Sequence, residues 1–107
     1  MKLWVALAGV GLLVAGNANA AMSQADGLAL AQKNACLTCH SIDHKIVGPA
    51  WKDVAAKYRG DKGAEARLIA KVKNGGAGNW GSVPMPPNSQ VSDADIKALV
   101  KFVLSLK

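Results

Sequence analysis

Cys36-Leu37-Thr38-Cys39-His40 is the stretch that decides the fold of this 107-residue chain. Cys-x-x-Cys-His is the attachment motif of a c-type haem. On a helical turn, positions three and four apart share a face, so both thiols and the imidazole point the same way. Cys36 and Cys39 can then form thioethers with the two vinyl groups of a porphyrin, and His40 can ligate its iron. The motif predicts one covalently attached haem c.

Three other interpretations of the two cysteines fit less well. A structural zinc site normally has four Cys or His ligands, which would require His44 as well as His40, both crowded beside the thiols. A thioredoxin-like redox pair belongs near a βαβ pattern, and the sequence has no strand pattern. A plain disulfide would leave His40 without a role.

The first twenty residues have the features of a secretory signal peptide. Met1-Lys2 is a short positive start, residues 3–15 are apolar without charge, and Ala18-Asn19-Ala20 has the small-x-small cleavage pattern. An uncleaved membrane anchor is the alternative, but thirteen apolar residues are fewer than the roughly 20 that span a bilayer. We predict cleavage after Ala20, which leaves residues 21–107 as a single exported domain with no segment suited to membrane insertion.

The exported part of the chain is basic. Without Lys2, 12 basic side chains stand against 7 acidic ones, a net charge of about +5. This balance suits either steering toward an acidic partner surface or ordinary solubility, and the sequence leaves both open. The basic residues are scattered, without a basic run or interleaved aromatics, so nucleic acid is not an expected partner. The lysines that could steer docking include Lys33, Lys45, Lys52 and Lys71.

Four helices are predicted, and no segment has the period of two that is typical of strands. Ser23 and Ser92 each begin a Ser-x-x-Asp start that resembles a capping box. The first of these helices leads to the haem motif, and the second carries an apolar stripe at helical spacing. Two more helices are expected at about 50–58 and 64–73, the latter ending at Gly75. The prediction is an all-α fold wrapped around one haem.

The second axial position of the iron decides what such a haem does. An open position suits gas binding or peroxide chemistry, whereas a protein ligand restricts the haem mainly to electron transfer. Met1 would leave with the signal peptide, and Met22 lies at the frayed mature N-terminus. His44 is only four residues from His40 and is tied to the same side of the ring, so we expect it to be a solvated loop residue.

Residues 75–90 have no helical periodicity, and their glycines and prolines predict an extended loop. A loop of about sixteen residues is uncommon in so small a domain unless it is functional. Met85 lies there within Pro84-Met85-Pro86-Pro87, where prolines fix φ and can hold the side chain rigidly. A lone Met often fills a gap in a core, but this one lies on no helix stripe. The sequence favours Met85 as the second iron ligand.

The mature chain resembles the short bacterial class I cytochromes c, and the cytochrome c-551 group in particular. The resemblance covers nearly all of residues 21–107. It rests on Cys36-x-x-Cys39-His40, Val47-Gly48-Pro49-Ala50-Trp51-Lys52-Asp53-Val54-Ala55, Lys73-Asn74-Gly75, Trp80-Gly81, Pro84-Met85-Pro86-Pro87-Asn88 and Lys101-Phe102-Val103-Leu104-Ser105. It implies a small fold of about four helices around the haem, with His40 and Met85 as the axial pair.

The resemblance also implies a set of supporting residues. The Pro49 carbonyl would accept a hydrogen bond from His40 and orient its ring. The Trp80 indole would donate to a haem propionate, and Asn88 would contact the sulfur region of Met85.

Two positions depart from the pattern of the group. Lys71 stands where many members have an arginine near a propionate, and that role is carried over to it. The first helix has Ala31 where many members place an aromatic residue. Phe102 is therefore expected to pack less tightly against this helix.

Together these features predict a diffusible, monomeric electron carrier rather than an enzyme. The resemblance implies a periplasmic carrier that docks transiently between a quinol-oxidising complex and a terminal acceptor, such as a nitrite reductase, an oxidase or a peroxidase. An enzyme or gas sensor with five-coordinate haem is one alternative, but cytochromes of the c′ kind carry the motif near the C-terminus of a longer bundle. A permanent subunit of a larger complex would need an anchor or a large apolar patch, and the sequence shows neither.

Overall fold

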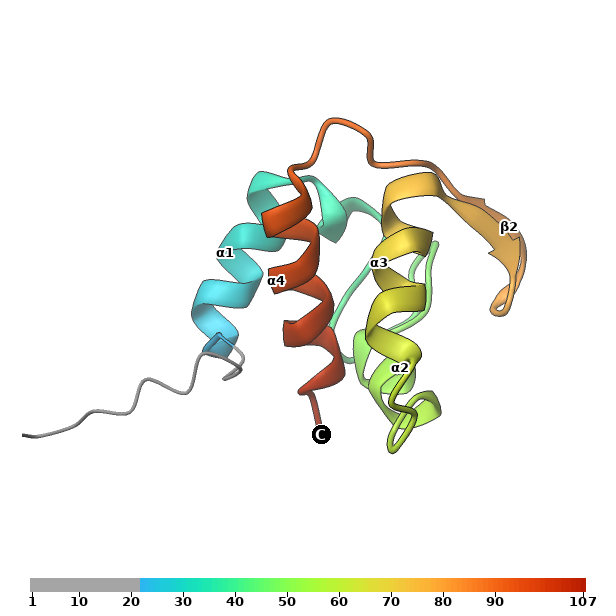
Figure 1. Cartoon of the computed structure of the whole chain (residues 1–107), viewed down its shortest axis with the longest axis horizontal. Coiled ribbons are helices and arrows are strands. Elements are labelled where there is room, and N and C mark those ends of the chain that lie inside the picture. The colour runs from blue at the N-terminus through green and yellow to red at the C-terminus, as the bar shows by residue number, and fades with distance from the viewer. Residues whose placement is uncertain (1–21) are drawn as a thin grey trace, which may run out of the picture.

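The computed structural model describes residues 22–107, which form a small helical domain with one two-stranded sheet (Figure 1). The elements are α1 (Gln24–Lys33), the short 3-10 helix η1 (Cys36–Thr38), α2 (Trp51–Lys57), α3 (Ala64–Asn74), β1 (Gly76–Gly78), β2 (Gly81–Met85) and α4 (Asp93–Leu104). This arrangement confirms the predicted helical class. The predicted signal segment and its cleavage site lie outside the described residues. Within residues 22–107, no helix has the length and apolar character needed to cross a membrane.

Local sequence explains where the helices begin and end. Ser23 and Ser92 are N-caps whose hydroxyls accept the backbone N–H of Asp26 and Asp95, with an N–Oγ distance of 3.2 Å in each case. These bonds satisfy amides that have no partner inside the helix. α3 ends at Gly75, whose φ of 74° is adopted readily by glycine. The predicted starts and this stop are therefore confirmed.

α4 is the helix against which the others pack. It contacts α1, α2 and α3, and Figure 1 shows it beside α1 and α3. Its apolar stripe is buried in two clusters, with Leu99, Phe102 and Val103 in the larger one and Ile96 and Val100 in the smaller one. The stripe predicted along this helix is confirmed, and the other three helices pack against it.

Phe102 packs directly against the backbone of α1. Its side chain is only 1% exposed, and a Cβ built on Gly27 would be 2.4 Å from ring atom Cδ1. The expectation that Phe102 packs less tightly opposite Ala31 is wrong. Gly27 lies one turn before Ala31 and has no side chain. The Phe102 ring therefore packs directly on the α1 backbone at this position.

An antiparallel hairpin lies within residues 75–90, where the sequence predicted an extended loop without regular structure. Gly76 pairs with Met85 and Gly78 with Gly81, with a register shift between the two pairs. The three glycines have φ of 144°, 112° and 108°, values that side-chain-bearing residues rarely adopt. Because glycine has no side chain, β1 cannot show the alternation by which a strand is recognised in a sequence.

Candidate functional site

A cavity of about 590 Å³ lies between the helices and the hairpin. This volume is within the range of small-molecule and cofactor sites, about 300–1,000 Å³, and most of the lining is apolar. The lining includes seven of the eight residues predicted from the sequence to form the site: Cys36, Cys39, His40, Pro49, Lys71, Trp80 and Met85. Residues from well-separated parts of the chain are thus brought to one concave surface.

The attachment motif forms a helical turn, as its spacing predicted, with 3-10 geometry over Cys36–Thr38. Ala35 enters the turn in the left-handed region with φ of 61°. The backbone N–H groups of Cys39 and His40 both donate to the Cys36 carbonyl, at 3.2 and 3.0 Å. Both thiols are half-buried and are not joined in a disulfide, and burial raises the pKa of the Cys36 thiol. The two cysteines and the histidine reach the same cavity, as the shared-face argument predicted.

The His40 ring is held by three neighbours. Its Nδ1 lies 2.9 Å from the Pro49 carbonyl oxygen, and since a carbonyl only accepts, Nδ1 carries the proton and Nε2 keeps a lone pair. The Trp51 ring stacks on the imidazole, with centroids 5.4 Å apart and planes at 24°. Gly48 lies so close that a Cβ there would be 2.5 Å from Cε1 of the ring. The ring is fixed with Nε2 available as a metal ligand.

Met85 is the last residue of β2, and its half-buried side chain lines the cavity. Its backbone passes very close to the end of α3, since a Cβ built on Gly75 would be 2.6 Å from the Met85 carbonyl oxygen. A glycine at position 75 is therefore required both by its positive φ and by this approach. Gly75 therefore both ends α3 and allows the Met85 backbone to pass close to the end of this helix.

Asn88 anchors the segment that follows Met85 to α3. Its Nδ2 donates to the carbonyls of Val72 at 2.9 Å and Pro86 at 3.3 Å, and its backbone N–H also donates to Val72 at 3.1 Å. Both amide hydrogens are thus engaged by backbone oxygens. Asn88 does not line the cavity, and these bonds differ from the predicted contact with the sulfur region of Met85.

The titratable groups of the lining make the cavity favourable for anions. Lys45 and Lys71 line it, and within residues 22–107 no Asp or Glu does. The Lys71 ammonium lies over the base of the hairpin, 2.7 Å from a Cβ built on Gly76. Trp80, 40% exposed, lines the cavity from the connection between the strands. A carboxylate-bearing ligand would find cations here and no opposing carboxylate.

The donor set is unsuited to a bare metal ion. In the described part of the chain, no cluster of three or more His, Cys, Asp or Glu residues could hold one. The convergent groups are two thiols, one imidazole with a free nitrogen and one thioether, in an apolar cavity. This set fits an iron that is already held by a porphyrin, with the thiols available for covalent attachment.

Comparison with known proteins agrees with this geometry. Residues 24–107 match the family described as Cytochrome c. This chain belongs to the cytochrome c family. It is 66% identical over 79 residues to the cytochrome c-551 of Allochromatium vinosum, which covers 74% of this chain and 84% of the relative. It is 53% identical over 96 residues to the cytochrome c-552 of Nitrosomonas europaea, covering 90% and 87%.

Solved structures show the same relationship. The crystal structure of wild-type Nitrosomonas europaea cytochrome c552 has a TM-score of 0.73 and 52% identity, and the match covers 75% of this chain and 99% of that one. The class 1 cytochrome MtoD of Sideroxydans lithotrophicus has a TM-score of 0.63 and 35% identity, covering 78% and 97%. The similarity to a small class I cytochrome of the c-551 group is thus shown by sequence and by fold.

As a member of the cytochrome c family, the chain carries a covalently attached haem c with its iron. Cys36-x-x-Cys39-His40 fits the attachment motif. The role of the protein is that of a small electron carrier. The cavity described above is the one to which both cysteines of the motif contribute.

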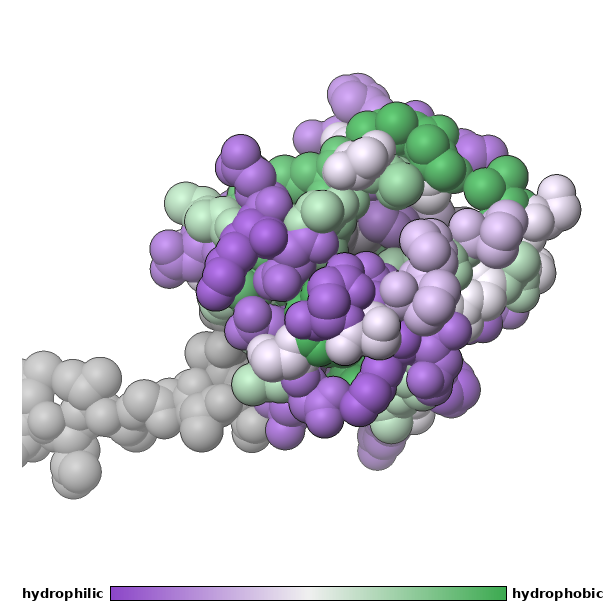
Figure 2. All heavy atoms as spheres, turned by 90° about the horizontal axis from the view of Figure 1, so that it is seen from above, coloured by the Kyte–Doolittle hydropathy of each residue, from purple (hydrophilic) through white to green (hydrophobic). Residues whose placement is uncertain are grey.

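Sequence reasoning missed several residues of this cytochrome site. Trp51 and Gly48 fix His40, but the sequence assigned neither of them a role at the site. No local pattern announces a stacking partner eleven residues along the chain. Three apolar side chains that the sequence did not assign to the site also line the cavity, namely Ile46, Val47 and Val83. Figure 2 shows hydrophobic residues gathered along one edge of the molecule.

Of the three rejected ligand candidates, Met1 lies outside the described residues, and the other two are not part of the cavity lining. His44 is exposed, as predicted. Met22 was expected at a frayed terminus, but it is half-buried and packs against the larger core cluster. Neither side chain lines the cavity.

Proposed function

We propose that this cytochrome c carries single electrons through an iron held between His40 and Met85 and closed to outside ligands. The observation that supports this most directly is that the two side chains line one cavity, although they are 45 residues apart and come from different elements. An iron with two protein ligands has no open position for a substrate, so the proposal is a carrier and not an enzyme.

When bound, haem c supplies the one-electron couple between ferric and ferrous iron. The hydrogen bond from His40 Nδ1 to the Pro49 carbonyl fixes the tautomer and raises the basicity of Nε2 as a ligand. The Met85 thioether is neutral and soft, which favours ferrous iron and raises the reduction potential. Trp51 and Gly48 hold the imidazole in one orientation, so this ligand need not move during electron exchange.

Lys71 and Trp80 are the proposed partners of the haem propionates. The Lys71 ammonium supplies a positive charge beside the hairpin, and the Trp80 indole supplies an N–H donor, both in the lining of the cavity. Neutralising a carboxylate near the iron also stabilises the haem in its site.

The proposal extends to where and with whom the protein works. The signal-like pattern of residues 1–20 supports a periplasmic location, with cleavage after Ala20 as part of the proposal. The net charge of about +5 suits transient docking of a monomer with acidic partner surfaces. The donor is a quinol-oxidising complex, and the acceptor is a nitrite reductase, an oxidase or a peroxidase.

The Met85→Ala variant tests the ligand assignment. It should lower the reduction potential by on the order of 0.1 V, within the ~0.8 V over which axial ligands tune haem. It should also remove the weak ferric absorbance at the red end of the spectrum and allow CO to bind. Met85→His should lower the potential while leaving the iron closed. The exposed His44 is the control, and His44→Ala should change neither property; an unchanged potential in Met85→Ala would refute the assignment.

A further inference from the structure

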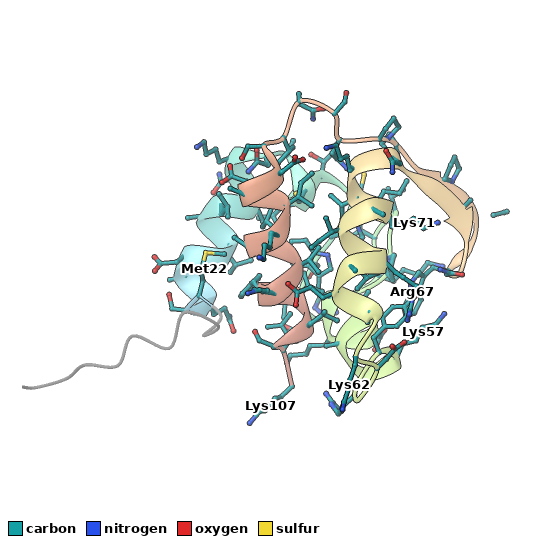
Figure 3. All side chains as sticks on the ribbon, viewed as in Figure 1. Met22, Lys57, Lys62, Arg67, Lys71 and Lys107 are labelled. Carbon is teal, nitrogen blue, oxygen red and sulfur yellow. The ribbon has the colours of Figure 1, made fainter. Side chains whose placement is uncertain are left out.

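Lys57, at the C-terminal end of α2, reaches across to the turn of the hairpin. Its Nζ donates to the Asn79 carbonyl oxygen at 3.0 Å and lies 4.5 Å from the centroid of the Trp80 ring. Figure 3 shows Lys57 on the same side of the molecule as the hairpin, together with Arg67 and Lys71. One ammonium group therefore makes two different contacts with neighbouring residues of the turn.

Apart from the cavity that it lines, this turn has few contacts with the rest of the protein. An isolated two-stranded hairpin is marginally stable in water, and residues 77–84 are all exposed. The base of the hairpin is anchored, since the Gly75 N–H donates to the Lys71 carbonyl at 2.7 Å and Asn88 is bonded to Val72. Within residues 22–107, the bond from Lys57 is the hydrogen bond that joins residues 76–85 to another element.

We propose that Lys57 is a positioning residue that latches the turn of the hairpin to α2 and so keeps Met85 in the cavity. Lys57 does not line the cavity, so it acts through the hairpin and not by contact with the ligand. A charged donor to a carbonyl is stronger than a neutral one, and the face of Trp80 adds a cation–π attraction. Met85 is the last residue of β2, so opening of the hairpin would displace it.

Amide hydrogen exchange measured by NMR on the haem-loaded protein tests the latch itself. Lys57→Met keeps the length of the side chain but removes the charge and the donor. It should speed exchange of the hairpin amides by about tenfold, as expected for losing an exposed charge-assisted bond and a cation–π contact. Exchange in α4 should not change, and Lys57→Arg should restore most of the protection.

Lys62→Met is the matched control, since it removes the same charge from an exposed lysine in the turn before α3. It should leave hairpin exchange at the level of the unmutated protein. Equal exchange of the hairpin amides in Lys57→Met and Lys62→Met would overturn the latch.

The consequence for Met85 rests on the proposed function and is tested separately with imidazole as the probe. Imidazole should bind the ferric iron of Lys57→Met about tenfold more tightly than that of Lys62→Met. The reason is that imidazole displaces Met85 more easily when the hairpin opens more often. Equal imidazole affinities would overturn the positioning role of Lys57. Failure of the ligand assignment has a different signature, which is an unchanged potential in Met85→Ala.

Discussion

The side of the cavity that carries His40 is packed against the core, whereas the side that carries Met85 is a hairpin rich in glycine. Trp51 is 6% exposed, stacks on His40 and meets Phe102 edge-on at 6.1 Å, so the histidine is continuous with the main core. In contrast, Met85 ends a hairpin in which Gly76, Gly78 and Gly81 have positive φ. One ligand is therefore fixed by side-chain packing and the other by backbone geometry and a few anchors. Changes in the core should affect global stability, and changes in the hairpin should affect the ligand.

The largest loss of stability is expected for Phe102→Ala. Removing a fully buried aromatic ring from the core should lower the free energy of unfolding by about 3–5 kcal/mol. Ser89→Ala, in the segment that follows Met85, is the control, and it should change stability by less than about 0.5 kcal/mol because its side chain is exposed and does not line the cavity. Denaturant titration of both haem-loaded variants measures the difference. Similar losses for the two variants would contradict the division into a side fixed by core packing and a side fixed by backbone geometry.

Gly27→Ala should cause the next largest change in the free energy of unfolding. The direction of this change shows whether Phe102 packs against α1. In an open helix, alanine is more favourable than glycine by about 1 kcal/mol. Here the added Cβ would be 2.4 Å from the buried Phe102 ring, and overpacking of this kind costs about 1–3 kcal/mol. We expect a net loss of stability by denaturant titration.

Ala29 lies on the exposed face of the same helix and provides the control for Gly27. Ala29→Gly should lose about 1 kcal/mol from helix propensity alone. A Gly27→Ala protein more stable than the unmutated one would show that Phe102 does not press on this helix.

The smallest change in stability is expected for a substitution of Asp61, which lies in the turn before α3 and does not line the cavity. The hydrogen bond from Arg67, and then that from the Gly63 backbone, lower the pKa of Asp61 below its ordinary value of 3.8. Because the folded-state pKa is the lower one, this carboxylate stabilises the fold above about pH 4. The contribution is lost as the pH falls through the folded-state pKa.

Asp61→Asn should therefore be slightly less stable than the unmutated protein at pH 7, by a small amount because the pair is exposed. The difference between the two proteins in denaturant titrations should shrink as the pH falls from about 4 toward 3. A difference that grows over this range would contradict the assignment.

The features that the sequence predicted correctly are those with local signals. The caps at Ser23 and Ser92, the stripe of α4 and the cysteine spacing are each contained in a few consecutive residues or one periodicity. The convergence of Met85 with the motif was expected from its rigid surroundings and from the family resemblance, and the cavity brings these residues together.

The features that the sequence did not predict depend on residues far apart in the chain. The contact of Gly27 with Phe102 and that of Lys57 with Trp80 join segments with no shared pattern. The hairpin was missed for another reason, because glycines at positive φ carry no alternation of side chains. The bond from Asn88 to the Val72 carbonyl joins residues sixteen positions apart, and no local pattern predicts it.

Binding of CO to the unmutated ferrous protein at neutral pH tests the central claim most directly. If His40 and Met85 both ligate the iron, CO should bind slowly or not at all under conditions in which it binds readily to Met85→Ala. Stopped-flow mixing of the reduced protein with CO, followed by haem absorbance, makes this comparison. Rapid CO binding by the unmutated protein would mean that the sixth position is open, and it would contradict the proposal of a closed electron carrier.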